Sequence, residues 1–210
     1  MRYEEEYHEI VHLNLLKNTR YYHFRAKYAK EIYLKHLNGR ILEFGSGLGQ
    51  NIFLNKDRAE GLEISDFSIN FSKKNGIKVT KSIEKLKSNF FDSVISVHSL
   101  EHLENPSYYL KEFHRVLKPS GKLLIVLPNQ FKNKPIKGFK PDIGKHLYSW
   151  NFNSINELLN HNKFKIVLNK FNYAYGFSVF YRLPFKIAVL FIKLSAIIRN
   201  NKEMMILAQK

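Results

Sequence analysis

The stretch Ile41-Leu42-Glu43-Phe44-Gly45-Ser46-Gly47-Leu48-Gly49-Gln50-Asn51 decides the fold of this chain. It begins as a short apolar strand with an acid near its end, and three glycines then follow at alternate positions. Glycine lets a backbone turn sharply and approach a ligand closely, where a side chain would collide. The dinucleotide fingerprint G-x-G-x-x-G needs its third glycine three residues after the second, and Gln50 stands there instead. The loop predicts a nucleotide-like ligand without the spacing of a dinucleotide site.

Strands and helices are expected to alternate around this loop. Apolar and β-branched runs bounded by turn residues predict strands at 40–44, 59–64, 78–80, 92–97 and 122–127, with helical segments at 50–55, 67–75 and 106–117. One or two helices are expected over 4–37. After Pro128 we expect a long loop at 129–144, a helix at 154–160, a strand at 163–173, an apolar segment at 178–200 and a last strand at 204–208. Strand–helix alternation favours a parallel sheet with helices on both faces.

A second acid follows the second expected strand, at Glu63, 18 residues after Gly45. A carboxylate offers two acceptor oxygens, which match the paired hydroxyls of a ribose. A surface acid at a strand end is the simpler alternative. Because the glycine loop and the acid occur together at the separation of a nucleotide site, we favour the ribose role.

A longer block carries a resemblance to a known family. Phe91-Asp92-Ser93-Val94 begins a strand, Ser99-Leu100-Glu101-His102-Leu103 follows it, and Arg115-Val116-Leu117-Lys118-Pro119-Ser120-Gly121 closes the next helix. With the glycine loop, these motifs resemble the small-molecule class I S-adenosylmethionine-dependent methyltransferases over residues 38–128. Ser120 replaces a glycine that is usual in the family.

The resemblance implies a Rossmann-like α/β fold, with a mostly parallel seven-stranded sheet, helices on both faces, N-terminal helices and an extra C-terminal helix. It implies a single methyltransferase domain over 1–210, composed of an N-terminal helical cap (1–38), a cofactor-binding core (39–128) and substrate-side elements with the last strands (129–210). It also implies that S-adenosylmethionine is the cofactor. The residues expected to bind it are Glu43, Gly45, Ser46, Gly47, Glu63, Ile64, Ser82, Ile83 and His98. Ser82 stands where the family often has an acid beside the adenine.

Methyl transfer asks little of the protein, because the methyl group on the sulfonium is already activated and the reaction depends on positioning and exclusion of water. An oxygen or nitrogen acceptor that carries a proton also calls for a general base, for which histidine is suited near neutral pH. Of the candidates His98, Glu101, His102 and His146, we predict His102 and His146 as catalytic. His146 lies in Lys145-His146-Leu147-Tyr148-Ser149-Trp150, which resembles a family segment that closes over the cofactor.

The string His98-x-x-Glu101-His102 also matches the H-x-x-E-H motif of one group of zinc proteases. We exclude a protease, since that motif needs a helix and this string follows a strand. Some ubiquinone-pathway and small-RNA 2′-O-methyltransferases place E-x-x-E-H here and bind a divalent metal, with His146 a candidate fourth ligand in this chain. We favour an ordinary turn without metal, because metal-free relatives share the Glu-His dipeptide.

Two features that the sequence lacks reduce the range of acceptor molecules. The chain has no cysteine, which disfavours methylation of pyrimidine C5, and it lacks the N/D-P-P-Y/F tetrapeptide of methyltransferases that act on adenine or glutamine amino groups. We predict a small-molecule acceptor, methylated at an oxygen of a sugar or glycan, a quinone-like ring or a lipid-linked metabolite. The alternatives are an RNA-modifying enzyme that uses the net charge of +16 and the lysines at 132, 134, 137, 140 and 145, or a non-catalytic cofactor-binding protein.

The segment 178–199 is apolar, with a basic stripe of Arg182, Lys186 and Lys193 at helical spacing and no acid. We expect it to be buried against the sheet, the N-terminal helices or a second subunit in a homodimer. Peripheral contact with a membrane surface is the alternative. Neither a signal peptide nor an uncharged run long enough to span a bilayer is evident, so the expected location is cytoplasmic, with a membrane-peripheral location as the variant.

Overall fold

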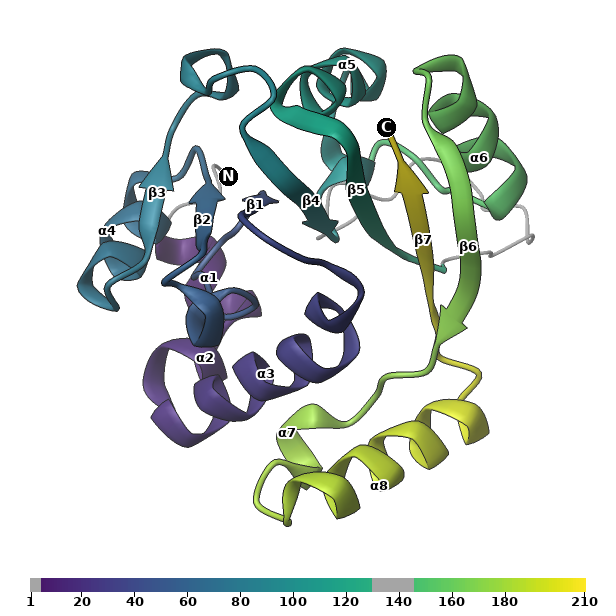
Figure 1. Cartoon of the computed structure of the whole chain (residues 1–210). Helices are drawn as coiled ribbons and strands as arrows, with labels where there is room; N and C mark the ends of the chain where they lie inside the picture. The colour runs from purple at the N-terminus through teal and green to yellow at the C-terminus, as the bar shows by residue number, and fades with distance from the viewer. Residues whose placement is uncertain (1–4, 130–145) are drawn as a thin grey trace, which may run out of the picture.

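A computed structural model describes residues 5–129 and 146–210, and its centre is a sheet of seven strands (Figure 1). The strands lie in the order β3-β2-β1-β4-β5-β7-β6. Their bounds are β1 Ile41–Phe44, β2 Ala59–Leu62, β3 Lys78–Thr80, β4 Phe91–Val97, β5 Leu117–Pro128, β6 Lys165–Asn172 and β7 Glu203–Gln209.

The sheet is mostly parallel. Strands β1 to β5 pair in parallel, whereas β7 runs antiparallel to both of its neighbours, β5 and β6. This order changes direction between β1 and β4, and ligands of open α/β sheets bind at such a point, beyond the carboxyl ends of the strands. The predicted Rossmann-like fold is confirmed.

Eight α-helices and four short 3₁₀ turns surround the sheet in the described ranges 5–129 and 146–210. The helices are α1 Glu5–Val11, α2 Leu13–Lys17, α3 Thr19–Ile32, α4 Asp66–Lys74, α5 Pro106–Val116, α6 Phe152–His161, α7 Phe177–Phe180 and α8 Phe185–Ile198. The turns are η1 Leu34–His36, η2 Phe53–Asn55, η3 Ile83–Lys85 and η4 Leu100–His102.

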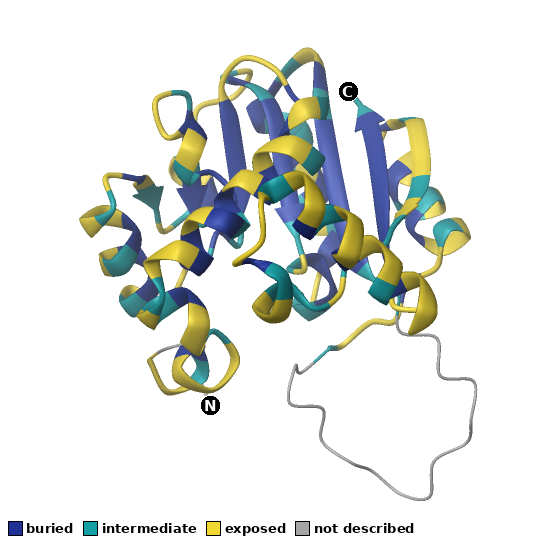
Figure 2. Cartoon of the chain, turned by 90° about the horizontal axis from the view of Figure 1, so that it is seen from below, coloured by how far each residue is buried: buried dark blue, intermediate teal, exposed yellow. Residues whose placement is uncertain are grey.

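Two apolar clusters hold these layers together. Side chains of α3 and α8 pack on one face of the sheet, and side chains of α5 and α6 pack on the other. The inner strands β2, β1, β4, β5 and β7 are mostly buried, while the edge strands β3 and β6 and the outer sides of the helices are exposed to a larger extent (Figure 2). Burial on both faces explains why β1, β4 and β5 are continuous apolar runs in the sequence.

Four expected elements differ in the structure. The segment 4–37, where one or two helices are expected, contains three, α1, α2 and α3. The segment 50–55 is not an α-helix but a turn that contains only η2, because the preceding glycine loop leaves the helical region of backbone space. The segment 178–200 is split into α7 and α8, since Pro184 stands at the N-cap of α8 and cannot continue a helix. Strand β5 begins at Leu117, and its pairing with β4 shifts register between Phe91 and Ser93. The loop expected at 129–144 falls outside the described residues, apart from Asn129.

Candidate active site

The glycine loop leaves β1 with a backbone that only glycine adopts easily. Gly45 has a φ of +66° and Gly47 a φ of +50°, both in the left-handed region. A Cβ on Gly45 would lie 2.2 Å from the Ser99 Oγ, whereas a Cβ on Gly47 would meet nothing within 4 Å. The hydroxyl of Tyr22 in α3 holds the loop by donating to the Leu48 carbonyl at 2.8 Å. Gly47 therefore faces open space that a ligand can fill.

Glu63 follows β2 and turns its carboxylate towards this loop. Oε2 accepts a hydrogen bond from the Gly47 N–H at 2.8 Å, and Oε1 accepts from the N–H groups of Ile64 and Ser65 at 2.8 and 2.9 Å. The side chain is 9% exposed. Three charge-assisted bonds in a nearly buried site fix both the carboxylate and the loop that it caps.

A cavity of about 240 Å³ lies against these residues. Its wall is formed by the glycine loop, by the residues that follow β2 and by His98 at the end of β4. The predicted residues that line it are Gly45, Gly47, Glu63, Ile64 and His98, joined by Phe44, Leu62, Lys81, Ser99, His102, Leu103 and Tyr109.

The first helix also lines this cavity, which the sequence analysis did not foresee. Tyr7, His8 and His12 reach it from the region of α1. The Nδ1 atoms of His8 and His12 are 2.9 Å apart, and His8 Nε2 lies 2.7 Å from the Ser68 hydroxyl of α4. Burial, the charge of His8 and the charge of Arg25 lower the pKa of His12 to about 3. The His8 and His12 rings therefore join α1 to α4 at the cavity wall, with His12 in its neutral form.

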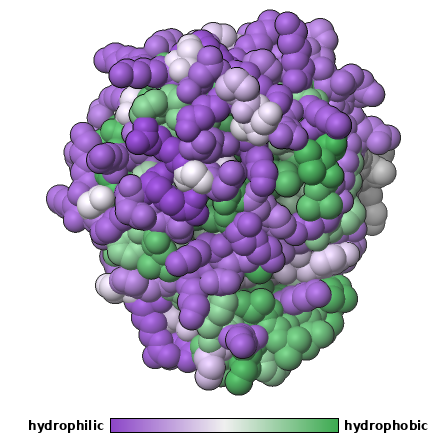
Figure 3. Space-filling model, in the orientation of Figure 1, coloured by the Kyte–Doolittle hydropathy of each residue, from purple (hydrophilic) through white to green (hydrophobic). Residues whose placement is uncertain are grey.

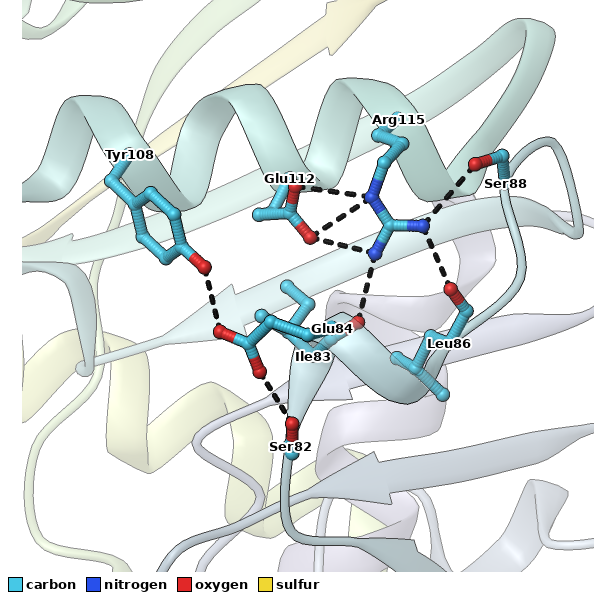
Figure 4. A network of polar contacts seen from close by, with 8 residues as sticks. All are labelled: Ser82, Ile83, Glu84, Leu86, Ser88, Tyr108, Glu112 and Arg115. Atoms are coloured by element: carbon cyan, nitrogen blue, oxygen red, sulfur yellow. Dashed lines mark hydrogen bonds and ion pairs between the residues drawn. The ribbon is translucent and has the colours of Figure 1, made fainter.

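Ser82 and Ile83 were predicted to contact the cofactor, but the structure turns their side chains elsewhere (Figure 4). The Ser82 hydroxyl donates to Glu84, which also accepts from the Tyr108 hydroxyl at 2.6 Å. Ile83 is 2% exposed and packs in the core, and its carbonyl accepts from Arg115 at 2.9 Å. This network fixes η3 against α5, and neither residue lines the 240 Å³ cavity.

A second, larger cavity of about 600 Å³ adjoins the first. The two cavities share Tyr7, His12, Gly45, Gly47, His98 and His102 as lining residues. Strand β7, the end of α8 and the start of α7 enclose the far side, through Glu203, Arg199 and Phe177. Ser46, also predicted to bind the cofactor, lines this larger cavity and not the smaller one.

His98 and Glu203 form an ion pair between β4 and β7, with His98 Nε2 2.9 Å from Glu203 Oε2. Tyr33 and Asn172 each donate to the other oxygen, Oε1, at 2.6 Å. Burial opposes the charge on His98, but the hydrogen bond and charge of Glu203, aided by Glu101, outweigh it and raise the pKa of His98. Burial likewise opposes the charge on Glu203, yet its bonds to His98, Tyr33 and Asn172 lower the pKa of Glu203. Each partner therefore favours the charged form of the other.

Glu43 lies below the glycine loop and is fully buried. Oε1 accepts from the Asn51 side chain at 2.7 Å, and no described residue donates to Oε2. Burial raises the pKa of Glu43 to about 8. The negative charge of Glu63 also raises this pKa, whereas the hydrogen bond from Asn51 lowers it. Glu43 lines neither cavity, so its place is under the loop rather than on the cavity wall.

Glu101, His102 and His146 come together at the edge of the larger cavity. The Nε2 atoms of His102 and His146 each lie 3.9 Å from Glu101 Oε1, and the two rings stack with centroids 4.8 Å apart. The Glu101 carboxylate is fully buried and has no hydrogen-bond donor among the described residues. One ligand atom from each of the three lies within 4.8 Å of the others, a spacing that can hold a metal ion. His98 is not part of this group, because Glu203 binds it.

The comparisons with known proteins agree with this geometry. A family model described as a methyltransferase domain matches residues 42–125. A ubiquinone biosynthesis O-methyltransferase from Rickettsia canadensis (strain McKiel) is 27% identical over 143 residues, which cover 60% of this chain and 59% of that protein. A crystal structure of an S-adenosylmethionine-dependent methyltransferase from Thermotoga maritima has a TM-score of 0.66 at 18% identity, with 97% of this chain and 96% of that chain covered.

Residues 42–125 match a methyltransferase domain, and the chain has the fold of the class I S-adenosylmethionine-dependent methyltransferases. Phosphoethanolamine N-methyltransferase 2 from Haemonchus contortus, solved with S-adenosyl-L-methionine, shares the fold with a TM-score of 0.62, 15% identity and coverage of 93% of this chain and 59% of that one. The predicted cofactor, S-adenosylmethionine, is therefore confirmed for the family. The match to the Rickettsia protein spans less than two thirds of that protein's length.

The methyltransferase site includes residues that the sequence analysis missed. Glu203 lies 105 residues after its partner His98, and Tyr33 stands before β1, so no local motif joins them. For Tyr7, His8 and His12 the sequence offers one indication, a cluster of aromatic and histidine residues within a charged segment. The lysines at 132, 134, 137, 140 and 145, on which the RNA alternative depends, lie outside the described residues.

Proposed function

We propose that this methyltransferase transfers the methyl group of S-adenosylmethionine to an oxygen atom of a small-molecule acceptor. The observation that carries the proposal is the pair of adjoining cavities, which meet at Gly47, His98 and His102. A donor in the smaller cavity and an acceptor in the larger one would meet at this shared wall. Holding two reactants in line is the main source of rate in such a transfer.

The residues of the smaller cavity fit the cofactor. The open face of Gly47 admits a ligand next to the backbone, where a side chain would fill the space. Glu63 uses three of about four acceptor positions on its carboxylate for backbone N–H groups, which leaves one for a ribose hydroxyl. When bound, S-adenosylmethionine supplies a methyl group on a positively charged sulfur. His98, which closes both cavities, would border that part of the ligand.

The cluster of Glu101, His102 and His146 would accept the proton of the acceptor hydroxyl. The Nε2 atoms of His102 and His146 each lie 3.9 Å from the buried Glu101 carboxylate, so a proton taken up by either imidazole would lie beside an acidic group. His102 lines both cavities and His146 lines the larger one, so either imidazole can face an acceptor. Oxygen as the methylated atom also finds support in the O-methyltransferase name of the Rickettsia relative.

The same cluster supports a second candidate, a divalent cation site that assists the transfer. The carboxylate of Glu101 and the two imidazoles offer ligand types suited to Zn²⁺ or Mn²⁺, at mutual distances within 4.8 Å. A cation there would supply Lewis acidity towards an oxygen acceptor. This differs from the ordinary turn favoured by the sequence, and the buried Glu101 carboxylate, which accepts no hydrogen bond from a described residue, is the observation that favours it.

Binding of the cofactor is tested by calorimetry with S-adenosylhomocysteine. Glu63→Ala should weaken binding at least about tenfold, because it removes a charged hydrogen-bond acceptor. Glu60→Ala is the matched control, since Glu60 lies on the same strand at the opposite end, where it lines a different cavity. If the wild-type protein binds no S-adenosylhomocysteine, the proposal fails.

Methyl transfer is tested with labelled S-adenosylmethionine and a panel of phenols, sugars, lipid-linked sugars and RNA. We expect label on an oxygen of a small molecule, and a rate that falls about 10²–10⁴-fold in His102→Ala or His146→Ala with S-adenosylhomocysteine binding retained. A chelator that abolishes transfer, with recovery on addition of Mn²⁺ or Zn²⁺, selects the cation candidate over the general base. Label only on RNA, or on no acceptor, contradicts the proposal.

A further inference from the structure

Helix α8 exposes an apolar surface that the fold does not use. Only Ala188, Ile192 and Ala196 are buried, in one stripe on the side that faces the sheet. The opposite side carries large exposed side chains, among which Leu190 is 54% and Ile198 84% exposed. We call this set the α8 outer face: Ile187, Leu190, Phe191, Leu194, Ile197 and Ile198. The sequence analysis expected burial of this segment, and the structure buries one stripe of it.

These side chains form one continuous surface. Their positions follow the spacing i, i+3, i+4, i+7, i+10 and i+11, which places them along one side of a helix. Val179 and Leu183, from α7 and the turn after it, are exposed as well. Figure 3 shows hydrophobic residues gathered over α7 and α8, with hydrophilic residues at the margin. Soluble proteins rarely expose such a patch unless something covers it.

The charges around this face are all of one sign. The charged residues of α8 and of the turns directly beside it are Arg182, Lys186, Lys193 and Arg199, and the sequence contains no acid from Gly176 to Lys202. An apolar surface edged with cations matches the headgroups and acyl chains of an anionic bilayer, where lysines reach the phosphates. No helix in the ranges 5–129 and 146–210 is long and apolar enough to cross a membrane. A helix of this kind lies along the bilayer surface rather than through it.

A second copy of the chain is a poorer match for the face. A two-fold dimer would place each patch against itself, so that four cations of one protomer approach four of the other. No acid in 176–202 could pair with them, and like charges across an interface are unfavourable. Charge therefore favours a negatively charged occupant.

We propose that the α8 outer face docks on the surface of an anionic lipid bilayer. Both ends of the α7–α8 region reach the larger cavity, through Phe177 before α8 and Arg199 after it. Docking places the bilayer beside the mouth of that cavity. The proposal concerns binding alone and does not depend on methyl transfer.

Flotation with vesicles tests the proposal. The protein should float with phosphatidylcholine vesicles that contain about one third phosphatidylglycerol and remain behind with phosphatidylcholine alone, and added salt should weaken the binding. Leu190→Gln with Leu194→Gln should lower the affinity at least about tenfold, because two apolar anchors are lost. Lys186→Glu with Lys193→Glu should lower it at least about 25-fold, since each lysine near an anionic surface contributes roughly fivefold.

Matched variants separate docking from general effects. Val167→Gln with Leu168→Gln removes exposed apolar side chains from β6, and Lys73→Glu with Lys74→Glu makes the same charge change on α4. Both pairs should retain vesicle binding, and all variants should bind S-adenosylhomocysteine as the wild type does, which reports an intact fold. Equal flotation with neutral and anionic vesicles, or equal losses in the control pairs, overturns the proposal. A dimer in solution that Leu190→Gln with Leu194→Gln dissociates, without vesicle binding, identifies a second copy as the occupant and also overturns it.

Discussion

The site has two corners that each hold a buried carboxylate, one at Glu63 and one at Glu101, and the surroundings of the two differ. At the Glu63 corner, three backbone N–H groups donate to the carboxylate, so its charge is balanced by the main chain. At the Glu101 corner, no described residue donates a hydrogen bond, and two imidazoles lie just beyond hydrogen-bond distance.

This contrast separates binding from chemistry. A carboxylate that the backbone already satisfies is rigid and suits a neutral polar ligand, which adds one hydrogen bond without a change of charge. A buried carboxylate without donors is unfavourable until a positive charge arrives, as a proton on an imidazole or as a cation. The first corner is therefore built to hold a ligand, and the second to respond to charge.

The largest effect is expected from Gly47→Val at the first corner. Valine resists a positive φ, and its side chain would occupy the open space next to Glu63, so affinity for S-adenosylhomocysteine should fall at least about 100-fold. Gly76→Val is the control, because Gly76 has a φ of +74° in a turn away from both cavities. It should lose stability but keep its affinity, as measured by calorimetry. Equal losses of affinity in both variants would show that strain, rather than the ligand's space, is responsible.

The same substitution at the two carboxylates should change stability in opposite directions. Glu63→Gln turns an amide NH₂ towards a backbone N–H and should lower the free energy of unfolding by about 1–3 kcal/mol. Glu101→Gln removes a buried charge that lacks donors and should leave that free energy unchanged or raise it. Urea unfolding with a chelator at about pH 8, where imidazole is mostly neutral, makes the comparison. A loss at Glu101 as large as that at Glu63 would contradict the contrast.

A smaller effect is expected at the His98–Glu203 pair, which lies between the two corners. The pKa of His98 is raised, so its contribution is lost as pH rises through that value, and the lowered pKa of Glu203 means that its contribution is lost as pH falls. The pair should therefore stabilise the folded protein most between pH 4.5 and pH 6.5, the ordinary pKa values of glutamate and histidine. A cycle of His98→Gln, Glu203→Gln and the double variant should give a coupling of about 0.5–1 kcal/mol near pH 5.5 and almost none near pH 9. The value is small because the His98 side chain is 43% exposed. A coupling that does not change with pH would rule out an ion pair.

The sequence predicted the first corner well, because its signals are local. Continuous apolar runs mark the parallel strands, and the strand ends place Gly47 and Glu63 at one edge of the sheet. Because β1 and β2 pair in parallel, the turn after β1 and the acid after β2 lie next to each other without any help from distant residues. The turn at 50–55 was misjudged as a helix because periodicity does not register the three left-handed glycines before it.

The second corner and its surroundings could be predicted only in part. The motifs point to His102 and His146, but the stacking of these rings beside Glu101, which lacks hydrogen-bond donors, depends on how residues 44 positions apart pack. Glu203, His8 and His12 reach the cavities through tertiary contacts that no sequence motif indicates. The family resemblance predicts that Ser82 and Ile83 contact the cofactor. In the structure Ser82 binds Glu84, which Tyr108 also binds, and Ile83 packs in the core, so neither side chain lines the smaller cavity.

The position of β7 has a consequence for how the protein is made. Residues 203–209 are the last of the seven strands in sequence order, yet they pair between β5 and β6 in the interior of the sheet. While the ribosome adds residues at roughly 5–20 per second, β5 and β6 each present an unpaired edge until these residues emerge. The nascent chain therefore spends seconds with two open edges and without Glu203. Chaperone demand and aggregation during synthesis should concentrate in that interval.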